Sequence, residues 1–520
     1  MKKQMLVLIS FIFLFLSASF FSVLSQNMPM YCREFRVGGG SRPDVASLPN
    51  GNFVICWEGE WHHVFAQVFD KKGEEASSVF QVSTTCSERY PEPRIASLRN
   101  GIFVVCWGVY KEKPNKNSDI YAQIFSEDGS KIGEEFIACS NPEIHQGQNW
   151  CEVTGLNNDD FIIAWESHEE DGWNGGIFGQ RFSQEGEPIG EQFQLNSFPE
   201  NADERLVSVS SIGESGFAAV WHREWFDFGP DVKYEEIGFQ CFDENNQYVW
   251  NEKTIKNKPI ETSAGPVIAA LRDSTFIVCW SCWANFFQEA VWAQKFDKNG
   301  DPMAEPFQVN TSFGQMTLET CIATLNSGDF VICWRHHTQV MKDGEELTYL
   351  EIRGQIFNEA AEKVGSEFKV NSISGENLRH NLPSVTAHGD SGFVVTWMEK
   401  WSTIFGKVFS TDSINVIEEE DEPLPSNFVL HRNYPNPFRE VTQIPYSLPE
   451  RERWYYVKIR IYNSMGALVK TLFREYQNGG HYSVDWDGTD RNGLRVAKGM
   501  YFCHVYVNGR TKTAKLIFMR

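Results

Sequence analysis

Seven apolar runs, each ending in tryptophan, recur along the first four hundred residues of the chain. Typical copies read FVICW at 53–57, FVVCW at 103–107, FIVCW at 276–280 and FVVTW at 393–397. The tryptophans that end the seven copies are Trp57, Trp107, Trp165, Trp221, Trp280, Trp334 and Trp397. The runs are short, rich in β-branched residues and apolar at every position, so we predict strands that are buried on both faces. A strand packed between two neighbouring sheets fits this pattern.

The sequence around each run repeats with a period of roughly 50 to 60 residues, in the range of propellers and solenoids. Each repeat predicts four strands: one of small residues, the tryptophan strand, a third that carries Gln-x-Phe, and a fourth that reads Phe-x-Val or Phe-x-Leu. Asn-Gly and Asp-x-x-Gly sequences between them predict tight turns, because glycine accepts positive φ. The fourth repeat has Asn246 where most have glycine. We therefore predict an all-β fold with a seven-bladed β-propeller over residues 26–410.

The two ends of the repeat region complement each other. An isolated fourth-strand sequence, Phe35-Arg36-Val37, precedes the first repeat, and the last repeat ends after Phe409 without a clear fourth strand. We expect the N-terminal segment to pair into the last blade and close the ring, which removes an exposed sheet edge. An open solenoid or a string of small sandwiches would leave this complementarity unexplained.

The N-terminus has the features of a secretory signal peptide. Lys2 and Lys3 precede an apolar block over 5–16, and small and polar residues follow up to Ser25. This order predicts a leader at 1–25 that is removed on export through the inner membrane. The apolar block is short for a bilayer span and no second block follows, so we expect no integral membrane segment in the mature protein.

The C-terminal part differs in character from the repeats. Residues 411–426 contain an acidic run and two prolines, which predict an extended linker. Beyond it, Val457, Ile459 and Ile461 alternate with polar residues, which predicts an antiparallel β-sandwich with one solvated face over 427–520.

Several ordered motifs mark this C-terminal part: NYPNPF at 433–438, VKIRIYNSMG at 457–466, WDGTD at 486–490, GMY at 499–501 and KLIF at 515–518. Together they resemble the type A sorting domain of proteins exported by the type IX secretion system, which is related to the immunoglobulin-like domain of flagellar hook-capping proteins. The resemblance implies an address read by the secretion machinery and delivery to the outer surface or the medium. The residues that carry it are Asn433, Pro435, Asn436, Pro437, Phe438, Gly466, Gly499, Tyr501 and Lys515. A retained structural module is the alternative.

Composition limits the partners. The net charge of −22 argues against nucleic acid and against anionic membranes, which would repel the chain. The sequence has no zinc spacing, phosphate-binding loop or Gly-x-Ser-x-Gly elbow, so we expect no cofactor and no metal. Asp485, Asp487 and Asp490 match no full calcium loop and predict a turn that its own side chains stabilise.

The twelve cysteines form no obvious framework. Cys56, Cys106, Cys279 and Cys333 precede the tryptophan in four repeats. We predict that they are small buried residues without a bridge, because stacked sheets lie about 10 Å apart. Cys139 and Cys151 flank one connection and could form a disulfide in an oxidising compartment.

The loops after the tryptophans vary in length, whereas the turns on the opposite face are short and uniform. Variable loops on a rigid scaffold are where binding residues concentrate. The aromatic, acidic and histidine residues that we predict for this loop face are Trp61, Trp173, Trp225, Trp283, Trp401, Glu58, Glu166, Glu224, His168, His222 and His336. Aromatic rings beside hydrogen-bonding groups suit sugars or protein side chains. The competing interpretation is that these residues only fill the blade ends.

These features predict an exported, surface-attached binding or adhesion protein, whose partners are glycans or surface proteins. A polysaccharide-degrading glycosidase or lyase is the main alternative, and a glycosidase would need two carboxylates that converge at a suitable separation. A structural envelope protein is the third.

Overall fold

The computed structural model describes residues 31–111, 117–139, 148–167, 176–197, 202–226, 233–255, 262–285, 288–311, 319–342, 345–371, 380–390, 392–400, 402–410, 428–448, 455–463, 468–477, 479–491, 493–507 and 510–519. The chain divides into two compact units, Met1–Ser413 and Ile414–Arg520, and each is described by itself. Within the described ranges, no helix is both long and apolar enough to cross a bilayer.

In the residues that the structure describes, the first unit contains seven antiparallel four-stranded sheets, here called blades 1 to 7. Blade 1 contains β2 (Ser41–Ser47), β3 (Phe53–Glu58), β4 (Val64–Phe69) and β5 (Phe80–Gln81). Blade 2 contains β6 (Arg94–Ser97), β7 (Phe103–Lys111), β8 (Asn117–Phe125) and β9 (Lys131–Ile137). Blade 3 contains β10 (Gln148–Gly155), β11 (Phe161–Ser167), β12 (Gly176–Phe182) and β13 (Pro188–Gln194). Blade 4 contains β14 (Ala202–Ile212), β15 (Gly216–Phe226), β16 (Lys233–Phe242) and β17 (Lys253–Ile255). Blade 5 contains β18 (Thr262–Ala270), β19 (Phe276–Asn285), β20 (Gln288–Phe296) and β21 (Phe307–Gln308). Blade 6 contains β22 (Thr320–Thr324), β23 (Phe330–Lys342), β24 (Glu345–Phe357) and β25 (Lys363–Lys369). Blade 7 contains β26 (His380–His388), β27 (Gly392–Glu399), β28 (Thr403–Ser410) and the N-terminal strand β1 (Tyr31–Gly39).

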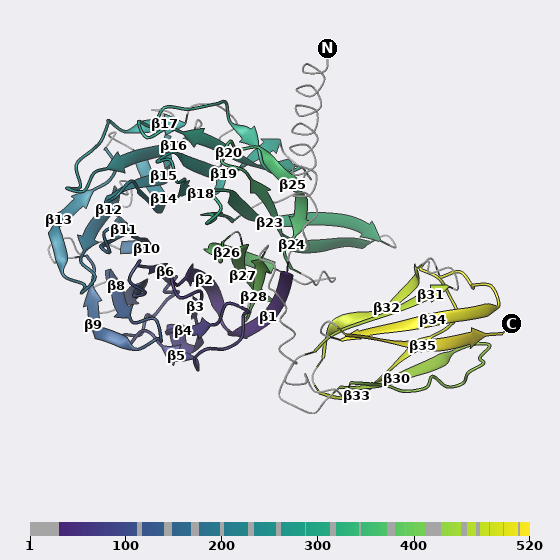
Figure 1. Ribbon diagram of the computed structural model, residues 1–520. Coiled ribbons are helices and arrows are strands. Elements are labelled where there is room, and N and C mark those ends of the chain that lie inside the picture. The colour runs from purple at the N-terminus through teal and green to yellow at the C-terminus, as the bar shows by residue number, and fades with distance from the viewer. Residues whose placement is uncertain are drawn as a thin grey trace, which may run out of the picture. The chain divides into compact units, whose positions relative to one another are not determined.

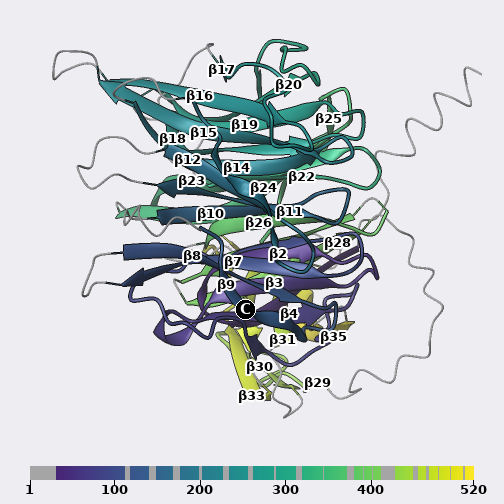
Figure 2. The same ribbon diagram turned by 90° about the vertical axis from the view of Figure 1, so that its left-hand side faces the viewer.

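The blades form a closed ring. Figure 1 looks along its axis, and Figure 2 shows it from the side, where the strands run from one face to the other. The first strands β2, β6, β10, β14, β18, β22 and β26 each contact the next, and β26 contacts β2. The fold is therefore a β-propeller.

The N-terminal strand closes this ring, as the sequence predicted. β1 pairs with β28 and completes blade 7, with Phe35 opposite Gly406. The Phe35 ring also packs into blade 1, where its centroid lies 6.0 Å from that of Phe53 and 5.1 Å from that of Phe69. The first strand of the chain thus links its last blade to its first.

The tryptophan strands are buried on both faces, which confirms the prediction made from their unbroken apolar runs. Every residue of β3 is buried, and Trp107 is fully buried. Side chains of two neighbouring blades share each core: Val54 and Cys56 of blade 1 pack in one cluster with Val105 and Trp107 of blade 2. Burial of this kind contributes about 25 cal/mol for each Å² of apolar surface removed from water.

Short turns with a repeated chemistry cover one face of the ring, here called the turn face. The Asp297 carboxylate accepts hydrogen bonds from the backbone N–H groups of Asn299 and Asp301, at 2.8 and 2.9 Å. Asn246, which replaces the usual glycine in blade 4, adopts a left-handed φ of 60°. Asparagine tolerates this conformation better than most residues do, so the turn survives the substitution.

The glutamine of each Gln-x-Phe sequence ties the third strand to the segment that follows it. The Gln67 Nε2 donates to Ser77 O at 2.8 Å, and the Gln294 Nε2 donates to Ala304 O at 2.9 Å. Gln67 is buried, so its amide needs such partners. This role explains why a polar residue recurs in an otherwise apolar strand.

The inner edge of each blade exposes backbone groups that no further strand pairs. Side chains of neighbouring blades satisfy several of them. Asp44 Oδ2 accepts from Ile95 N at 2.9 Å, and Ser208 Oγ accepts from Ile268 N at 3.3 Å. Small polar residues on the first strands therefore hold adjacent blades together.

The cysteines depart from the prediction in one place. The Sγ atoms of Cys106 in blade 2 and Cys151 in blade 3 lie 3.3 Å apart. We expected Cys106 to lie too far from the next sheet, and we expected Cys139 to be the possible partner of Cys151. The spacing of about 10 Å holds for sheets stacked face to face. Blades converge toward the ring axis, and Cys151 lies beside a bulge of β10, so the sulfur atoms approach each other.

The second unit is a sandwich of two sheets, one with β29 (Val429–Leu430), β30 (Thr442–Leu448) and β33 (Gly480–Trp486), and one with β32 (Leu468–Gln477), β31 (Tyr455–Asn463), β34 (Gly499–Val507) and β35 (Arg510–Phe518). Val457, Ile459 and Ile461 are fully buried between the sheets, which confirms the alternation read from the sequence. Asn508-Gly509, the expected turn between β34 and β35, lies outside the described residues.

Asp487 and Asp490 stabilise turns of the sandwich, as predicted, whereas Asp485 lies on a strand opposite Gln443. The Asp487 Oδ1 accepts from the backbone N–H of Thr489 at 3.0 Å and from its hydroxyl at 2.6 Å. The Asp490 Oδ1 accepts from Leu494 N at 2.9 Å. These carboxylates therefore stabilise their own turns.

Candidate functional site

An exposed tryptophan marks one point on the loop face, which is the face opposite the turn face. β3 ends at Glu58 and β4 begins at Val64, and the connection contains the short 3-10 helix η2 (Glu60–His62). Trp61 has φ 58° and ψ 30°, and His62 has φ 55°. Left-handed residues other than glycine cost on the order of 1 to 3 kcal/mol each. This backbone leaves the Trp61 side chain 82% exposed.

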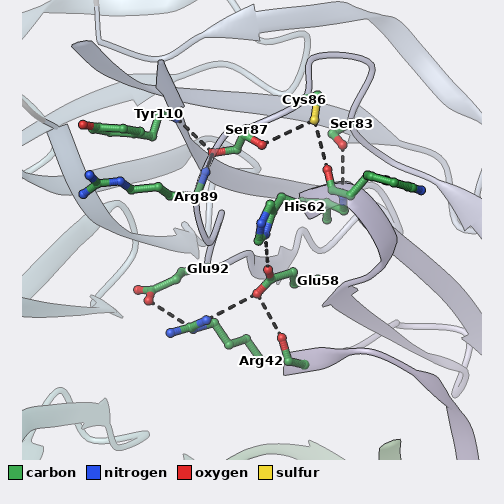
Figure 3. A network of polar contacts seen from close by, with 12 residues as sticks. Arg42, Glu58, His62, Ser83, Cys86, Ser87, Arg89, Glu92 and Tyr110 are labelled. Carbon is green, nitrogen blue, oxygen red and sulfur yellow. Dashed lines mark hydrogen bonds and ion pairs between the residues drawn. The ribbon is translucent and has the colours of Figure 1, made fainter. Parts of the chain in front are cut away.

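A buried carboxylate holds this strained turn. Glu58 is 4% exposed, and its Oε1 lies 2.7 Å from His62 Nδ1. Its Oε2 accepts hydrogen bonds from Ser41 Oγ at 2.9 Å and from Arg42 Nη1 at 3.3 Å (Figure 3). The Cys86 thiol donates to the Trp61 carbonyl at 3.0 Å. A buried carboxylate is stable only with such partners, so the network fixes the turn in one geometry.

Arg42 joins two carboxylates at the boundary of blades 1 and 2. Its Nε lies 3.0 Å from Glu92 Oε1, while its Nη1 bonds Glu58 (Figure 3). The two carboxyl oxygens contact one planar guanidinium and so lie at most about 9 Å apart. Burial raises the pKa of Glu92, although the charges of Arg42 and Arg94 oppose this shift.

A second exposed aromatic ring adjoins this network. The Arg42 Cζ lies 4.4 Å from the centroid of the Tyr90 ring, and the His62 ring meets that ring edge to face at 5.4 Å. Tyr90 is 63% exposed. We call Trp61, Tyr90, Arg42, Glu58, His62 and Glu92 the aromatic site. Two exposed rings thus lie beside paired charged groups on a rigid frame.

A third exposed aromatic residue belongs to blade 3 on the same face. Trp150 is 43% exposed and lies at the bulge that begins β10, with φ 46°. Arg42 and Glu92 hold the corresponding left-handed positions near the start of the first strands of blades 1 and 2. Among the described side chains, the strongly exposed aromatic residues of the loop face therefore belong to blades 1 to 3.

The other predicted acidic and histidine residues lie on other blades. Glu166 is buried and accepts a hydrogen bond from Leu206 N, the left-handed residue at the bulge of β14. His222 is buried, with its Nε2 3.5 Å from Glu235 Oε2. Glu224 lies on β15, opposite Asp203 and Glu235. Glu166 nevertheless lies near enough to the aromatic site for its charge to add to burial in raising the pKa of Glu92. His222 and Glu224 belong to blade 4.

His336 lies in blade 6 and is also buried. Burial, followed by the charge of Arg353, lowers its pKa to about 4. The imidazole is therefore neutral at physiological pH. It belongs to β23 of blade 6, whereas the aromatic site is formed by residues of blades 1 and 2.

Five predicted residues cannot be placed. His168, Trp173 and Trp401 lie outside the described residues. The backbones of Trp225 and Trp283 belong to β15 and β19, but their side chains fall outside the described part of the chain. Of the predicted binding residues, the structure thus brings Trp61 and Glu58 together.

Sequence reasoning missed Arg42, Tyr90 and Glu92. A signal for two of them existed: Arg42 and Glu92 each precede a proline near the start of the first strand of a blade, as Leu382 does in blade 7. In these three blades the residue before the proline is left-handed. Tyr90 lies in a connection between blades, and no local pattern distinguishes it.

The motif residues of the sandwich hold its last strand. Asn436 Nδ2 donates to Lys515 O at 2.8 Å, its Oδ1 accepts from Ile517 N at 2.9 Å, and Phe438 N donates to Ile517 O at 3.0 Å. Further members have similar internal roles: Asn433 donates to Thr442, Pro435 O accepts from Thr442, Pro437 follows a cis peptide bond, Gly499 pairs with Phe518 and Tyr501 donates to Ala497 O. Gly466 lies outside the described residues. Tyr434, within the first motif, is 79% exposed.

The described residues contain no group of three or more histidine, cysteine, aspartate or glutamate side chains arranged to hold a metal ion. The charged groups of the aromatic site bond to each other instead. Its chemistry is therefore that of stacking surfaces and paired hydrogen-bonding groups.

Comparisons with known proteins bear mainly on the C-terminus. Residues 451–510 match the FlgD Ig-like domain family, and no curated protein matches the chain. Among solved structures, an α-L-arabinanase of Penicillium chrysogenum complexed with arabinobiose is 11% identical, with a TM-score of 0.40, over 61% of this chain and 98% of that chain. The polysaccharide lyase Uly1 is 8% identical, with a TM-score of 0.44, over 70% of this chain and 88% of that chain. The Hadza microbial sialidase Hz136 is 9% identical, with a TM-score of 0.37, over 68% of this chain and 74% of that chain. The family match agrees with the immunoglobulin-like sandwich of the second unit.

Proposed function

We propose that this protein is an exported binding protein whose ring binds glycans at the aromatic site. The observation that carries the proposal is the presentation of Trp61 at 82% exposure on two consecutive left-handed residues. Backbone strain persists where the surroundings impose it, and it concentrates at functional positions. Here Glu58, His62 and Arg42 supply that support.

The chemistry of the aromatic site favours sugars. Flat indole and phenol rings pack against the C–H faces of sugar rings, and nearby polar groups orient the hydroxyls. Arg42 and His62 stand beside Tyr90 and can serve this purpose. The net charge of −22 disfavours polyanions, so we expect neutral glycans.

A glycosidase is less compatible with the same geometry. The carboxyl oxygens of Glu58 and Glu92 are no farther apart than about 9 Å, and glycosidases use separations of about 5 to 9.5 Å. However, Arg42 bonds both carboxylates and stands between them, where a substrate or water would have to enter. The arrangement supports binding better than hydrolysis.

A binding screen with matched variants tests the proposal. Trp61→Ala and Tyr90→Ala should each weaken binding to a neutral glycan surface by about tenfold, which corresponds to about 1.4 kcal/mol of lost stacking. Tyr248→Ala is the control, because Tyr248 is 56% exposed but lies on the turn face.

Two results would contradict this assignment. One is glycan binding that survives both substitutions at the aromatic site. The other is release of reducing ends from the bound glycan that stops in Glu58→Gln or Glu92→Gln while binding continues, which would favour the glycosidase.

We also propose that residues 1–25 direct export and that residues 427–520 form a sorting domain read by the type IX secretion machinery, with delivery to the outer surface. The ordered motifs and the match to the FlgD Ig-like domain support this assignment. A chain that ends before residue 427 should fold its ring and remain in the periplasm of a host with this system. Surface delivery of the shortened chain would favour the alternative of a retained structural module.

A further inference from the structure

Two positions meet at the interface between consecutive blades. One is the residue before the tryptophan on the second strand of a blade. The other lies near the start of the first strand of the next blade, directly after a left-handed residue in blades 1 to 4, 6 and 7. In chain order the pairs are Cys56 and Pro93, Cys106 and Cys151, Ala164 and Val207, Val220 and Pro266, Cys279 and Thr320, Cys333 and Pro383, and Thr396 and Pro43. The boundary of blades 2 and 3 alone has cysteine at both positions.

The two cysteines of this pair are in contact. Their Sγ atoms lie 3.3 Å apart, and the two residues are 0% and 3% exposed. A disulfide bond measures about 2.05 Å, so small side-chain rotations would bring the sulfurs to bonding distance. The corresponding residues at blades 5 and 6 also lie close together: burial raises the pKa of the Cys279 thiol, and the neighbouring Thr320 side chain opposes this shift.

We propose that Cys106 and Cys151 form a disulfide that links blade 2 to blade 3. This inference rests on the proposed export, because disulfides persist in oxidising compartments and are rare in the cytosol. Apolar side chains surround the pair, among them Val104, Ile163 and Trp165. The described residues offer no third ligand that would make the pair a metal site.

The reaction is an exchange with a protein disulfide of an exported thiol oxidoreductase. One cysteine thiolate attacks that disulfide and forms a mixed disulfide, and one thiol of the oxidoreductase leaves. The second thiolate then attacks the mixed bond and releases the other thiol. The chain loses two electrons and two protons, and the oxidoreductase gains them as two thiols.

Burial determines when the bond forms. Desolvation, followed by the hydrogen bond with Cys151, raises the pKa of the Cys106 thiol well above its ordinary value. The folded ring therefore holds little thiolate at neutral pH, and thiolate is the reacting species. We expect the bond to form before blades 2 and 3 pack and to resist soluble reductants afterwards. It would also fix Cys151 beside Trp150, the exposed aromatic residue of blade 3.

The test uses the full chain produced behind a leader that the expression host exports, so that the outcome does not depend on residues 1–25. The protein is denatured, its free thiols are alkylated, and its peptides are mapped by mass spectrometry before and after reduction. We expect Cys106 and Cys151 in one cross-linked peptide pair and unalkylated. Alkylation of both before reduction, in exported protein, overturns the proposal.

Two variants give matched controls. Thr320→Cys should create a second cross-link, to Cys279, because positions 279 and 320 correspond to 106 and 151. Cys151→Thr reproduces the native contact of Cys279 with Thr320, so it should fold but melt about 5 °C lower in non-reducing buffer. A new cross-link in Thr320→Cys without the native one would show that the compartment is oxidising and that the proposal is wrong. Failure of the native leader alone would instead count against the proposed export.

Discussion

Trp57 and Trp61 are four residues apart and occupy opposite environments. Trp57 is 3% exposed and packs in a core with Val45, Ile55 and Ile404 of blades 1 and 7. Trp61 is 82% exposed on a turn that has two left-handed residues. The same side chain therefore stabilises the ring at one position and is available to a ligand at the other.

Trp57 belongs to a feature that recurs in every repeat, whereas the turn that carries Trp61 is, among the described connections, particular to blade 1. Each of the seven repeats has a counterpart of Trp57, because every blade must bury the same strand against its neighbours. Among the connections that the structure describes, the turn that carries Trp61 is the one with a 3-10 helix. Repeated features build the scaffold, and features found in one blade carry the proposed function. Substitutions in the scaffold should thus change stability, and substitutions at the aromatic site should change binding.

The largest effect should come from a buried tryptophan remote from the aromatic site. Trp334 is fully buried in blade 6, between side chains of blades 5 and 6. Trp334→Ala should reduce the free energy of unfolding by about 3 to 5 kcal/mol, because it removes apolar contacts and leaves a cavity. Chemical unfolding measures the loss. Glycan binding by the folded fraction should not change, and a selective loss of binding would contradict the separate roles of Trp334 and the aromatic site.

A smaller effect should come from a buried carboxylate. Glu204 lies in blade 4, where it bonds Arg223 Nε at 2.7 Å, and burial raises its pKa to about 7. An acid whose folded pKa exceeds its unfolded value of 4.5 favours the folded state when protonated. The wild-type protein should therefore lose about 2 to 3 kcal/mol of stability relative to Glu204→Gln as the pH rises from about 4.5 to 7.

Unfolding curves of both proteins over this pH range measure that difference. Parallel pH profiles would show that Glu204 stays ionised beside Arg223. Binding at the aromatic site should be equal in the two proteins at each pH, since Glu204 lies outside that site.

A modest effect should come from the turn face. Asp297→Ala removes two hydrogen bonds to the backbone of one turn. We expect a loss of about 1 kcal/mol in the free energy of unfolding and no change in glycan binding. Altered binding in this variant would place part of the ligand on the turn face.

Much of the ring could be predicted from the sequence because its determinants are local and repeated. The unbroken apolar runs indicated strands buried on both faces, and the unpaired sequence at 35–37 indicated the closing strand. The tight turns followed from glycine and aspartate at fixed positions.

The aromatic site could be predicted only in part, because it depends on how two blades meet. Trp61 and Glu58 stood out as an aromatic and an acidic residue on a variable loop. Arg42 and Glu92 reach the site because each takes a left-handed conformation, which residue type alone does not indicate. Glu166 was misleading for the converse reason: it resembles Glu58 in sequence but satisfies the backbone of the next blade.

The most direct test of the proposed function is the effect of Trp61→Gly on both stability and glycan binding. Glycine adopts a φ of 58° without strain, so the free energy of unfolding should stay the same or rise by up to about 1 kcal/mol. Binding to the neutral glycan should fall at least about tenfold, because the stacking ring is gone. Undiminished binding by this variant, or a marked loss of stability, would contradict the account.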